Sequence, residues 1–340
     1  MIYATATPLP SARTLRPSAT VGLLILNHPH CISSAREKQR EGLRRSASTI
    51  QVRPSCYFSH QATFYLPKVF TVAKRIDLFD STYSHFTKQV LETVRKETFG
   101  QDIGQNSWTT VEEYDQFLSW LDLRPEHHVL EVASGSGGPT RYLANSVSCR
   151  VTGIDANEAG VATATLSVAS SRQVDRITFE VADANSPLPF DDNSFDAILC
   201  IDSMNHFPDR LQVFQEWRRV LRPGRRAVFT DPVVITGPVT NDELALRSSI
   251  GLFLFVPPGV NEQLIDASGF RLLKHEDVST NAAQVSGRWH ESRQRHKDAL
   301  IKIEGEERFE GLQEFFATVQ SLSSERRLSR IVYLVEKPGR

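Results

Sequence analysis

The sequence predicts a doubly wound α/β fold, in which helices cover both faces of a seven-stranded sheet. Three observations carry this prediction. Short apolar runs alternate with helical patterns from residue 127 onward, which is typical of a parallel sheet with covering helices. Three of the runs end in an acid, at Glu131, Asp155 and Asp183. Residues 129–144, VLEVASGSGGPTRYLA, pass from an apolar run through a glycine-rich turn into helical spacing.

The expected elements follow from periodicity and from turn residues. The expected strands are the run that begins at Val129 and residues 150–154, 177–181, 195–201, 226–230, 270–274 and 330–335. The expected helices are residues 69–86, 86–99, 111–121, 158–170, 210–221, 244–250 and 261–268. Thr109 or Thr110 can cap the helix at 111–121, and the sequence LRPG stops the helix at 210–221. We expect the basic stretch 288–302 to form a solvated helix face.

The glycine-rich turn predicts a bound small ligand. Glycines let the backbone approach a ligand closely, and the free amides of a helix N-terminus donate hydrogen bonds there. A dinucleotide fingerprint would need Gly or Ala three positions after Gly137, where the chain has Thr140. A nicotinamide-dependent oxidoreductase is therefore disfavoured, and an ordinary strand-turn-helix corner is the other alternative.

Composition narrows the class of protein. The chain has 340 residues, enough for one large domain with an extension or for two domains, and its net charge of -1 argues against a nucleic-acid binder. Its four cysteines show no metal-binding spacing and are expected to be reduced thiols. No apolar run approaches the roughly 20 residues that span a bilayer, so no transmembrane segment is expected. No coiled-coil heptad is evident, and no oligomeric state is predicted.

Residues 1–68 differ from the rest. They are rich in Arg and Ser and poor in acids, which is the composition of an organelle transit peptide. A disordered tail, or a start codon placed too early, explains the same composition. We therefore expect a cytoplasmic protein, or a mitochondrial or plastid one if this leader is a transit peptide. The domain proper is expected at 69–340, divided into a helical cover at 69–126, a core at 127–235 and a lid with the last strands at 236–340.

The strand-turn-helix segment resembles motif I of the class I S-adenosylmethionine-dependent methyltransferases, which have a Rossmann-like fold. Glu131 takes the acidic position of that motif, Gly135 and Gly137 match two of its glycines, and Ala133 replaces the first. The resemblance implies that Asp155 accepts both ribose hydroxyls and that Asp183 and its neighbour hold the adenine. The cofactor-binding residues it implies are Glu131, Ala133, Gly135, Gly137, Asp155, Ala156, Asp183, Ala184, Cys200 and Trp108.

Two further segments resemble the small-molecule members of that family, of the phosphoethanolamine and glycine or sarcosine types. They are FGQDIGQNSW at 99–108, which would cover the cofactor, and CIDSMNHF at 200–207. Asp202 and His206 match the Asp-x-x-x-His of the phosphoethanolamine enzymes, which implies a catalytic His206 with Tyr83 as its partner. The implied substrate-binding residues are Gln105, Asp202 and, from an apolar lid at 251–259, Phe255.

The sequence therefore predicts methyl transfer from S-adenosylmethionine to a small-molecule acceptor, with nitrogen favoured over oxygen or carbon. In-line transfer needs an aligned nucleophile, exclusion of water and, for a protonated acceptor, a base such as His206. The alternative from another class is a catalytically silent cofactor-binding or regulatory subunit with the same fold. Trp108 and Trp289 could face a cation, although core packing is favoured for both.

Overall fold

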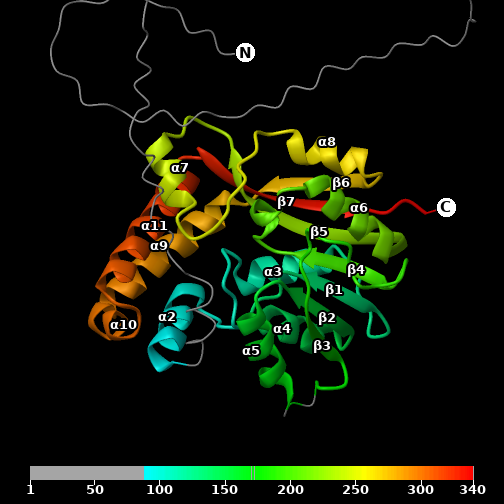
Figure 1. The fold of residues 1–340 in the computed structure, drawn as a ribbon, viewed down its shortest axis with the longest axis horizontal. Coiled ribbons are helices and arrows are strands. Elements are labelled where there is room, and N and C mark those ends of the chain that lie inside the picture. Colours follow the sequence, from blue (N-terminus) through cyan, green and yellow to red (C-terminus); the bar gives the residue numbers. More distant parts are fainter. Residues whose placement is uncertain (1–87, 170, 172, 340) are drawn as a thin grey trace, which may run out of the picture. The chain divides into compact units, whose positions relative to one another are not determined.

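The computed structural model describes residues 88–169, 171 and 173–339; the expected leader, the helix at 69–86 and Tyr83 lie outside the described residues. A seven-stranded sheet with the order β3-β2-β1-β4-β5-β7-β6 forms the centre of this part (Figure 1). The strands are β1 (His128–Val132), β2 (Arg150–Asp155), β3 (Ile177–Val181), β4 (Phe195–Cys200), β5 (Leu221–Ile235), β6 (Arg271–Asp277) and β7 (Leu328–Glu336). The first five are parallel, whereas β7 runs antiparallel to β5 and β6. The predicted fold class is confirmed.

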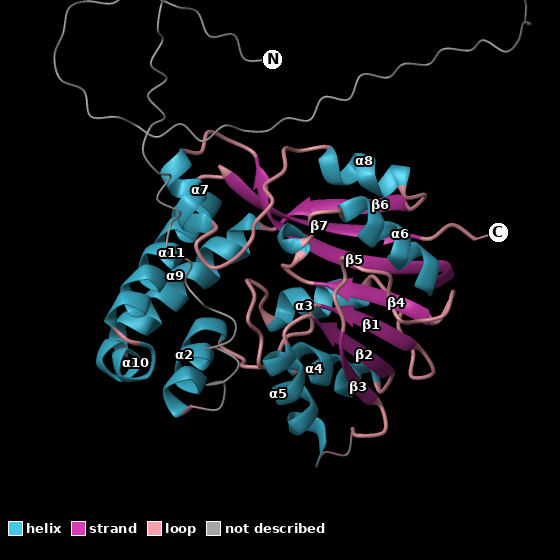
Figure 2. Cartoon of the chain, viewed as in Figure 1, coloured by secondary structure: helices cyan, strands magenta, loops and turns pink. Residues whose placement is uncertain are grey.

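Helices cover both faces of the sheet (Figure 2). Their bounds are α2 (Gln89–Phe99), α3 (Val111–Ser119), α4 (Gly138–Val147), α5 (Glu158–Ala169), α6 (Arg210–Val220), α7 (Asn241–Arg247), α8 (Val260–Ala267), α9 (Ser279–Arg295), α10 (Lys297–Glu304) and α11 (Glu306–Ser324). As expected, α3 begins with a Thr110 cap, whose hydroxyl accepts the Glu113 amide. No described helix is long and apolar enough to cross a membrane.

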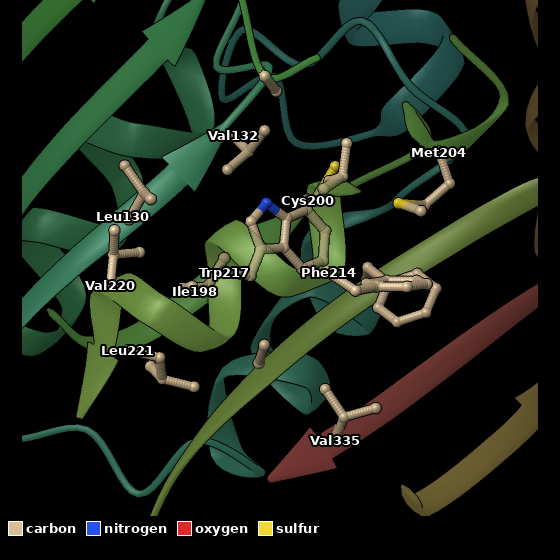
Figure 3. Packing of buried hydrophobic residues seen from close by; sticks show 14 of the residues in the cluster. Leu130, Val132, Ile198, Cys200, Met204, Phe214, Trp217, Val220, Leu221 and Val335 are labelled. Atoms are coloured by element: carbon tan, nitrogen blue, oxygen red, sulfur yellow. The ribbon is translucent and has the colours of Figure 1, made fainter. Parts of the chain in front are cut away.

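Alternate residues of each strand build two separate cores, because successive side chains point to opposite faces. On one face, Leu130, Ile198 and Phe229 pack with Phe214 and Trp217 of α6 (Figure 3). On the other face, neighbouring strand residues pack with α3, α4 and the end of α5; they are Val129, Val151, Ala197, Leu199, Val228, Val332 and Leu334. The inner strands of the sheet are therefore buried on both sides, as their near-continuous apolar runs predict, whereas the edge strands β3 and β6 are partly exposed.

A third core joins α2, α9, α10 and α11 beside the sheet (Figure 1). The expected solvated face at 288–302 is wrong in part, since Arg293 is 3% exposed and pairs with the buried Glu304. Arg295 and His296 bind Glu97 of α2, with ion-pair distances of 2.7 and 3.0 Å. This basic stretch therefore fastens α2 to α9. The helix α11 was not among the expected elements.

Several element bounds differ from expectation, and those of β5 and α7 have a clear physical reason. The helix α6 ends at Val220, directly before LRPG, as expected. The strand β5 begins at Leu221 and not at the expected Arg226, so the LRPG segment forms its first residues. Pairing with β4 is interrupted between the Phe195 and Ala197 positions, so Pro223 occupies a stretch where the strand ladder is irregular. Helix α7 begins at Asn241, three residues before the expected start, because Thr240 and Glu243 form a capping box.

Candidate cofactor and acceptor cavity

A cavity of about 540 Å³ opens at the carboxyl ends of β1, β2 and β4. This is the edge of a parallel sheet at which ligands of open α/β folds bind. One end is walled by the glycine-rich turn and the acids that follow the strands. The other end is walled by segment 103–109, by residues 201–207 after β4, and by side chains of α7, α9 and α11.

The glycine-rich turn is held by Asp155. One carboxylate oxygen accepts the Gly135 amide and the other accepts the Asn157 amide, both at 2.8 Å. Burial raises the pKa of Asp155, and these two amides oppose the shift. Ala133 and Gly135 both have positive φ, at 60° and 54°, so an alanine adopts the conformation that glycine takes more readily. Asp155, Ala133 and Gly135 all line the cavity, where the sequence places the cofactor.

Two adjacent glycines serve packing. A Cβ on Gly137 would collide with the Phe179 ring of β3, and Gly137 is not part of the cavity wall. A Cβ on Gly138 would collide with the backbone of Ile103 and Gly104. Gly138 thus lets the segment that covers the cavity lie directly on the start of α4. The expected cofactor contact of Gly137 has no support from its position.

Glu131 is buried at the inner end of the cavity. Its carboxylate accepts hydrogen bonds from the hydroxyls of Thr140 and of Tyr114, the latter at 3.4 Å. Burial raises the pKa of Glu131 to about 7, although both hydrogen bonds lower it. Thr140, the residue that breaks a dinucleotide fingerprint, is therefore a hydrogen-bond donor to this acid.

The remaining cofactor positions divide into two groups. Ala156, Asp183, Ala184 and Trp108 line the cavity, and Asp183 accepts the amide of Asn185 at 2.9 Å. Cys200 does not line it: the thiol is fully buried in the core beside α6. Cys200 is the last residue of β4, whose residues are all buried, and its side chain packs in the core and not in the cavity wall.

The wall also fits a polar ligand. Five lining residues carry buried side-chain atoms without a hydrogen-bond partner among the described residues, namely Asn106 Nδ2, Ser134 Oγ, Asn185 Oδ1, Asn205 Oδ1 and Arg247 Nη1. Buried polar groups are ordinarily paired, so atoms left over at a cavity wall indicate a ligand with polar groups of its own. A nucleoside with amino-acid groups meets this need. No group of three or more His, Cys, Asp or Glu residues that could hold a metal ion occurs in the described part of the chain.

His206 lies on a short 3-10 turn (Met204–His206) after β4 and lines the cavity. Its Nδ1 lies 2.9 Å from the Leu252 carbonyl oxygen, and its Nε2 lies 3.2 Å from Asn205 Nδ2. A carbonyl only accepts, so we assign the proton to Nδ1, and the lone pair of Nε2 then accepts a hydrogen bond from the Asn205 amide. This is the tautomer that a general base requires.

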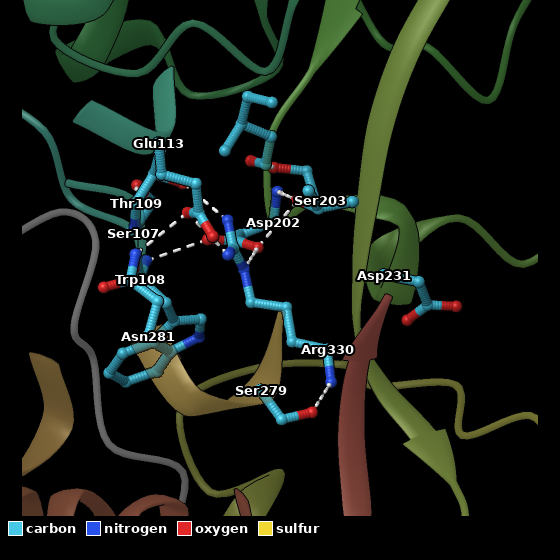
Figure 4. A network of polar contacts seen from close by, with 12 residues as sticks. Ser107, Trp108, Thr109, Glu113, Asp202, Ser203, Asp231, Ser279, Asn281 and Arg330 are labelled. Atoms are coloured by element: carbon cyan, nitrogen blue, oxygen red, sulfur yellow. Dashed lines mark hydrogen bonds and ion pairs between the residues drawn. The ribbon is translucent and has the colours of Figure 1, made fainter. Parts of the chain in front are cut away.

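Both carboxylate oxygens of Asp202 accept hydrogen bonds from other residues of the chain. Its Oδ1 accepts from Arg330 at 2.6 Å and from the Thr230 hydroxyl at 2.7 Å, and its Oδ2 accepts the Trp108 amide at 2.8 Å. Arg330 also binds Glu113 at 2.7 Å and the Thr109 hydroxyl at 2.6 Å (Figure 4). Asp202 Oδ2 therefore holds the segment that covers the cavity, and Oδ1 binds Arg330 and Thr230. Asp202 also lines the cavity, and its expected substrate contact stays a prediction. Arg330, which is fully buried, was not predicted from the sequence to belong to this site.

Two other expected substrate residues also differ in role. Gln105 lines the cavity, but its amide bonds within its own segment, accepting the Ile103 amide at 2.8 Å and donating to the Gln101 carbonyl at 3.2 Å. Phe255 is not part of the wall, whereas Phe253 is. The other aromatic residues at this end of the cavity are Phe253, Trp289, Phe315 and Phe316. Phe253 belongs to the expected apolar lid and Trp289 was considered as a residue facing a cation, whereas Phe315 and Phe316 were not assigned from sequence.

Comparison with known proteins identifies the domain that contains the cavity. Residues 130–229, from β1 into β5, match the protein family described as a methyltransferase domain. The chain contains a class I S-adenosylmethionine-dependent methyltransferase domain. S-adenosylmethionine is the cofactor of this domain, and its family motifs supply the turn and the acids described above.

Relatives of this methyltransferase domain are similar over part of their length. The methyltransferase GfsG of Streptomyces halstedii is 36% identical over 171 residues, which are 48% of this chain and 60% of the relative. The glycine/sarcosine/dimethylglycine N-methyltransferase of Actinopolyspora halophila is 29% identical over 213 residues, 61% of this chain and 36% of the relative. The chain thus spans less than two thirds of these relatives.

Solved structures agree on the fold. The structure of the Haemonchus contortus phosphoethanolamine N-methyltransferase 2 with phosphomonomethylethanolamine and S-adenosylhomocysteine has a TM-score of 0.65. The match covers 77% of this chain and 60% of that chain at 18% sequence identity.

Proposed function

We propose that this protein transfers a methyl group from S-adenosylmethionine to a small-molecule acceptor, with nitrogen favoured over oxygen or carbon. The observation that carries the proposal is one cavity that joins the cofactor wall, at Glu131, Gly135 and Asp155, to an apolar end that contains His206. The preference for nitrogen is supported by the relative named as a glycine/sarcosine/dimethylglycine N-methyltransferase.

The chain's own residues have few chemical tasks in this reaction. The bound cofactor supplies a methyl group made electrophilic by its sulfonium. Alignment of the acceptor falls to the walls of the cavity, because proximity and orientation supply a large part of the rate. His206 Nε2 removes a proton where the acceptor nitrogen or oxygen carries one, while the Leu252 carbonyl holds Nδ1–H in place.

Calorimetric titration of S-adenosylhomocysteine and S-adenosylmethionine into the full chain tests the cofactor step. We expect micromolar binding that Asp155→Ala weakens more than about tenfold, since hydrogen bonds to a charged group contribute about 1.5–3 kcal/mol. Asp192→Ala, an exposed acid, is the control. Folded protein that binds neither ligand would overturn the proposal. Binding without any methylated product from a panel of amines, phenols and carbon acids would favour the catalytically silent subunit.

Substitution of His206 tests the base. We expect His206→Gln to lower kcat by about 10²–10⁴-fold for an acceptor that must lose a proton, the usual contribution of general base catalysis. The affinity for S-adenosylhomocysteine should stay within a few-fold, and His275→Gln on β6 should retain full turnover. A His206→Gln enzyme that works within a few-fold of the parent would show that His206 is not the base.

A further inference from the structure

We propose that the methyl acceptor is an apolar, ring-bearing acid whose single anionic group, a carboxylate or comparable monoanion, binds Arg247. This inference rests on the proposed function and names the substrate class of the same cavity. Arg247 is the last residue of α7, is 3% exposed and lines the cavity. A buried cation at the wall of a binding cavity needs a negative charge as its partner, which either the protein or the ligand must supply.

Arg247 has no ionic or hydrogen-bonding partner among the described residues, and its Nη1 is buried and unsatisfied. The other four buried arginines each pair with a carboxylate: Arg95 with Asp102, Arg210 with Asp231, Arg293 with Glu304 and Arg330 with Asp202 and Glu113. The fold therefore neutralises its internal arginines as a rule. Arg247 is the exception, and it is the one that lines the cavity.

The acids whose charges act on Arg247 already pair with other arginines. Asp202 and Asp231 are the groups whose charges act on it. Asp202 binds Arg330 and Asp231 binds Arg210, each at 2.6 Å. Burial lowers the pKa of Arg247 to about 10, so its guanidinium remains protonated at neutral pH. A ligand anion is thus the missing partner.

Aromatic rings surround this cation. The guanidinium carbon lies 4.8 Å from the ring centroid of Phe253, 5.3 Å from that of Phe315 and 5.8 Å from that of Trp108. Trp289 and Phe316 continue the same wall, with their rings stacked at 4.8 Å. Such a surface accepts a flat apolar body, and the rings hold the guanidinium by cation-π contact while leaving its N–H donors unused.

The count of cations sets the charge of the ligand. Arg247 is the one Lys or Arg among the described residues that line the cavity. One guanidinium balances a monoanion and binds a carboxylate through two N–H groups. A phosphomonoester dianion would lack a second cation, and a permanently cationic acceptor would be repelled.

The anionic group and the reacting atom can belong to one small molecule. The Phe253 ring contacts the His206 ring edge-on at 4.9 Å and lies under the Arg247 guanidinium at 4.8 Å. His206 and Arg247 therefore both contact the same phenyl ring, that of Phe253. An aromatic amino or hydroxy acid has the length to place its nitrogen or oxygen at His206 and its carboxylate at Arg247.

Three matched pairs of probes test the proposal: benzoate with benzamide, cinnamate with cinnamamide, and 2-naphthoate with 2-naphthamide. Each is titrated into the full chain saturated with S-adenosylhomocysteine, with quenching of tryptophan fluorescence as the readout because Trp108 and Trp289 line the cavity. We expect at least one acid to bind at least tenfold more tightly than its amide. Arg247→Gln should remove that preference by weakening the acid, with the amide changed less than threefold.

Controls separate anion binding from a structural role. Arg218→Gln, on the exposed side of α6, lowers the net charge equally and should keep the preference, and Arg247→Lys should keep part of it. Equal binding of acid and amide in all three pairs would overturn the proposal, as would phenyl phosphate binding more tightly than benzoate. Arg247→Gln weakening acid and amide alike would show a structural role. Failure of the cofactor proposal is seen separately, as absent S-adenosylhomocysteine binding, and the acid-amide comparison can then be made without it.

Discussion

The buried carboxyl of Glu131 makes cofactor binding sensitive to pH. Burial raises its pKa to about 7, so part of the ligand-free protein holds a proton there at neutral pH. A bound sulfonium cation favours the ionised carboxylate, which means that binding lowers this pKa and releases a proton. We expect the affinity for S-adenosylmethionine to rise with pH through about 7 and to level off above it. Calorimetry in buffers of different ionisation enthalpy measures the released proton.

Glu131→Gln, which cannot ionise, is the matched variant for this prediction. The Glu131→Gln variant should bind S-adenosylmethionine with an affinity that does not change across the same range of pH. In the wild type, binding of S-adenosylhomocysteine, whose sulfur is uncharged, should release a smaller fraction of a proton than binding of S-adenosylmethionine. A wild-type affinity that is flat through pH 7, or a Glu131→Gln profile like that of the wild type, would contradict the assignment of the proton to Glu131.

At the scale of single residues, the sequence predicts position better than role. The acids that end strands, at Glu131, Asp155 and Asp183, were expected at one edge, and all three line the cavity. Asp202 was also placed correctly, but its role depends on Arg330, which lies 128 residues away in the chain. Arg247 has no sequence signature, because its burial is produced by rings from separate elements.

Among the elements, Arg330 of β7 joins the end of β4 to α3 and to segment 103–109, which covers the cavity. Replacing it by Met leaves Asp202 and Glu113 buried without their cation, and we expect a loss of about 3–5 kcal/mol in the free energy of unfolding. Because Asp202 holds the Trp108 amide, the covering segment should also loosen, so S-adenosylhomocysteine should bind more weakly. Urea denaturation and calorimetry measure the two effects.

Arg210→Met is the control for this variant. Arg210 is similarly buried and paired with Asp231, but its hydrogen bonds go to Asp231, Asn261 and the Leu254 carbonyl and not to segment 103–109. Its loss should therefore destabilise the fold and leave S-adenosylhomocysteine affinity within about threefold. If both variants weaken cofactor binding equally, loss of stability alone explains the effect and the positioning role of Arg330 is wrong.

The elements that could be predicted are those whose pattern is local. Every expected strand was found, because apolar runs bounded by turn residues suffice to locate them. The helix α11 was missed, although Phe309, Leu312, Phe316 and Val319 repeat at helical intervals, because its acids and polar residues give a mixed pattern. The LRPG signal correctly ended α6 at Val220, but the start of β5 at Leu221 could not be predicted, since it depends on pairing with β4.

At the scale of the whole molecule, the cavity has two halves of different origin. The cofactor half comes from the sheet and from residues 131–185, where family motifs lie close together in the chain. The acceptor half is assembled from segment 103–109 and from α7, α9 and α11, which are brought together only by tertiary packing. This is why the cofactor was predictable from sequence whereas the acceptor wall was not.

This division predicts that cofactor and acceptor binding can be changed separately. Phe315→Leu removes a ring from the acceptor wall, so the complex with S-adenosylhomocysteine should bind 2-naphthamide at least tenfold more weakly, while the affinity for S-adenosylhomocysteine itself stays within threefold. Phe309→Leu is the matched control, because Phe309 is equally buried on the same helix but does not line the cavity. Each change should cost about 1–3 kcal/mol of stability. Parallel losses of both ligands in Phe315→Leu would show that the two halves act as one unit, in which α11 shapes the cofactor wall as well.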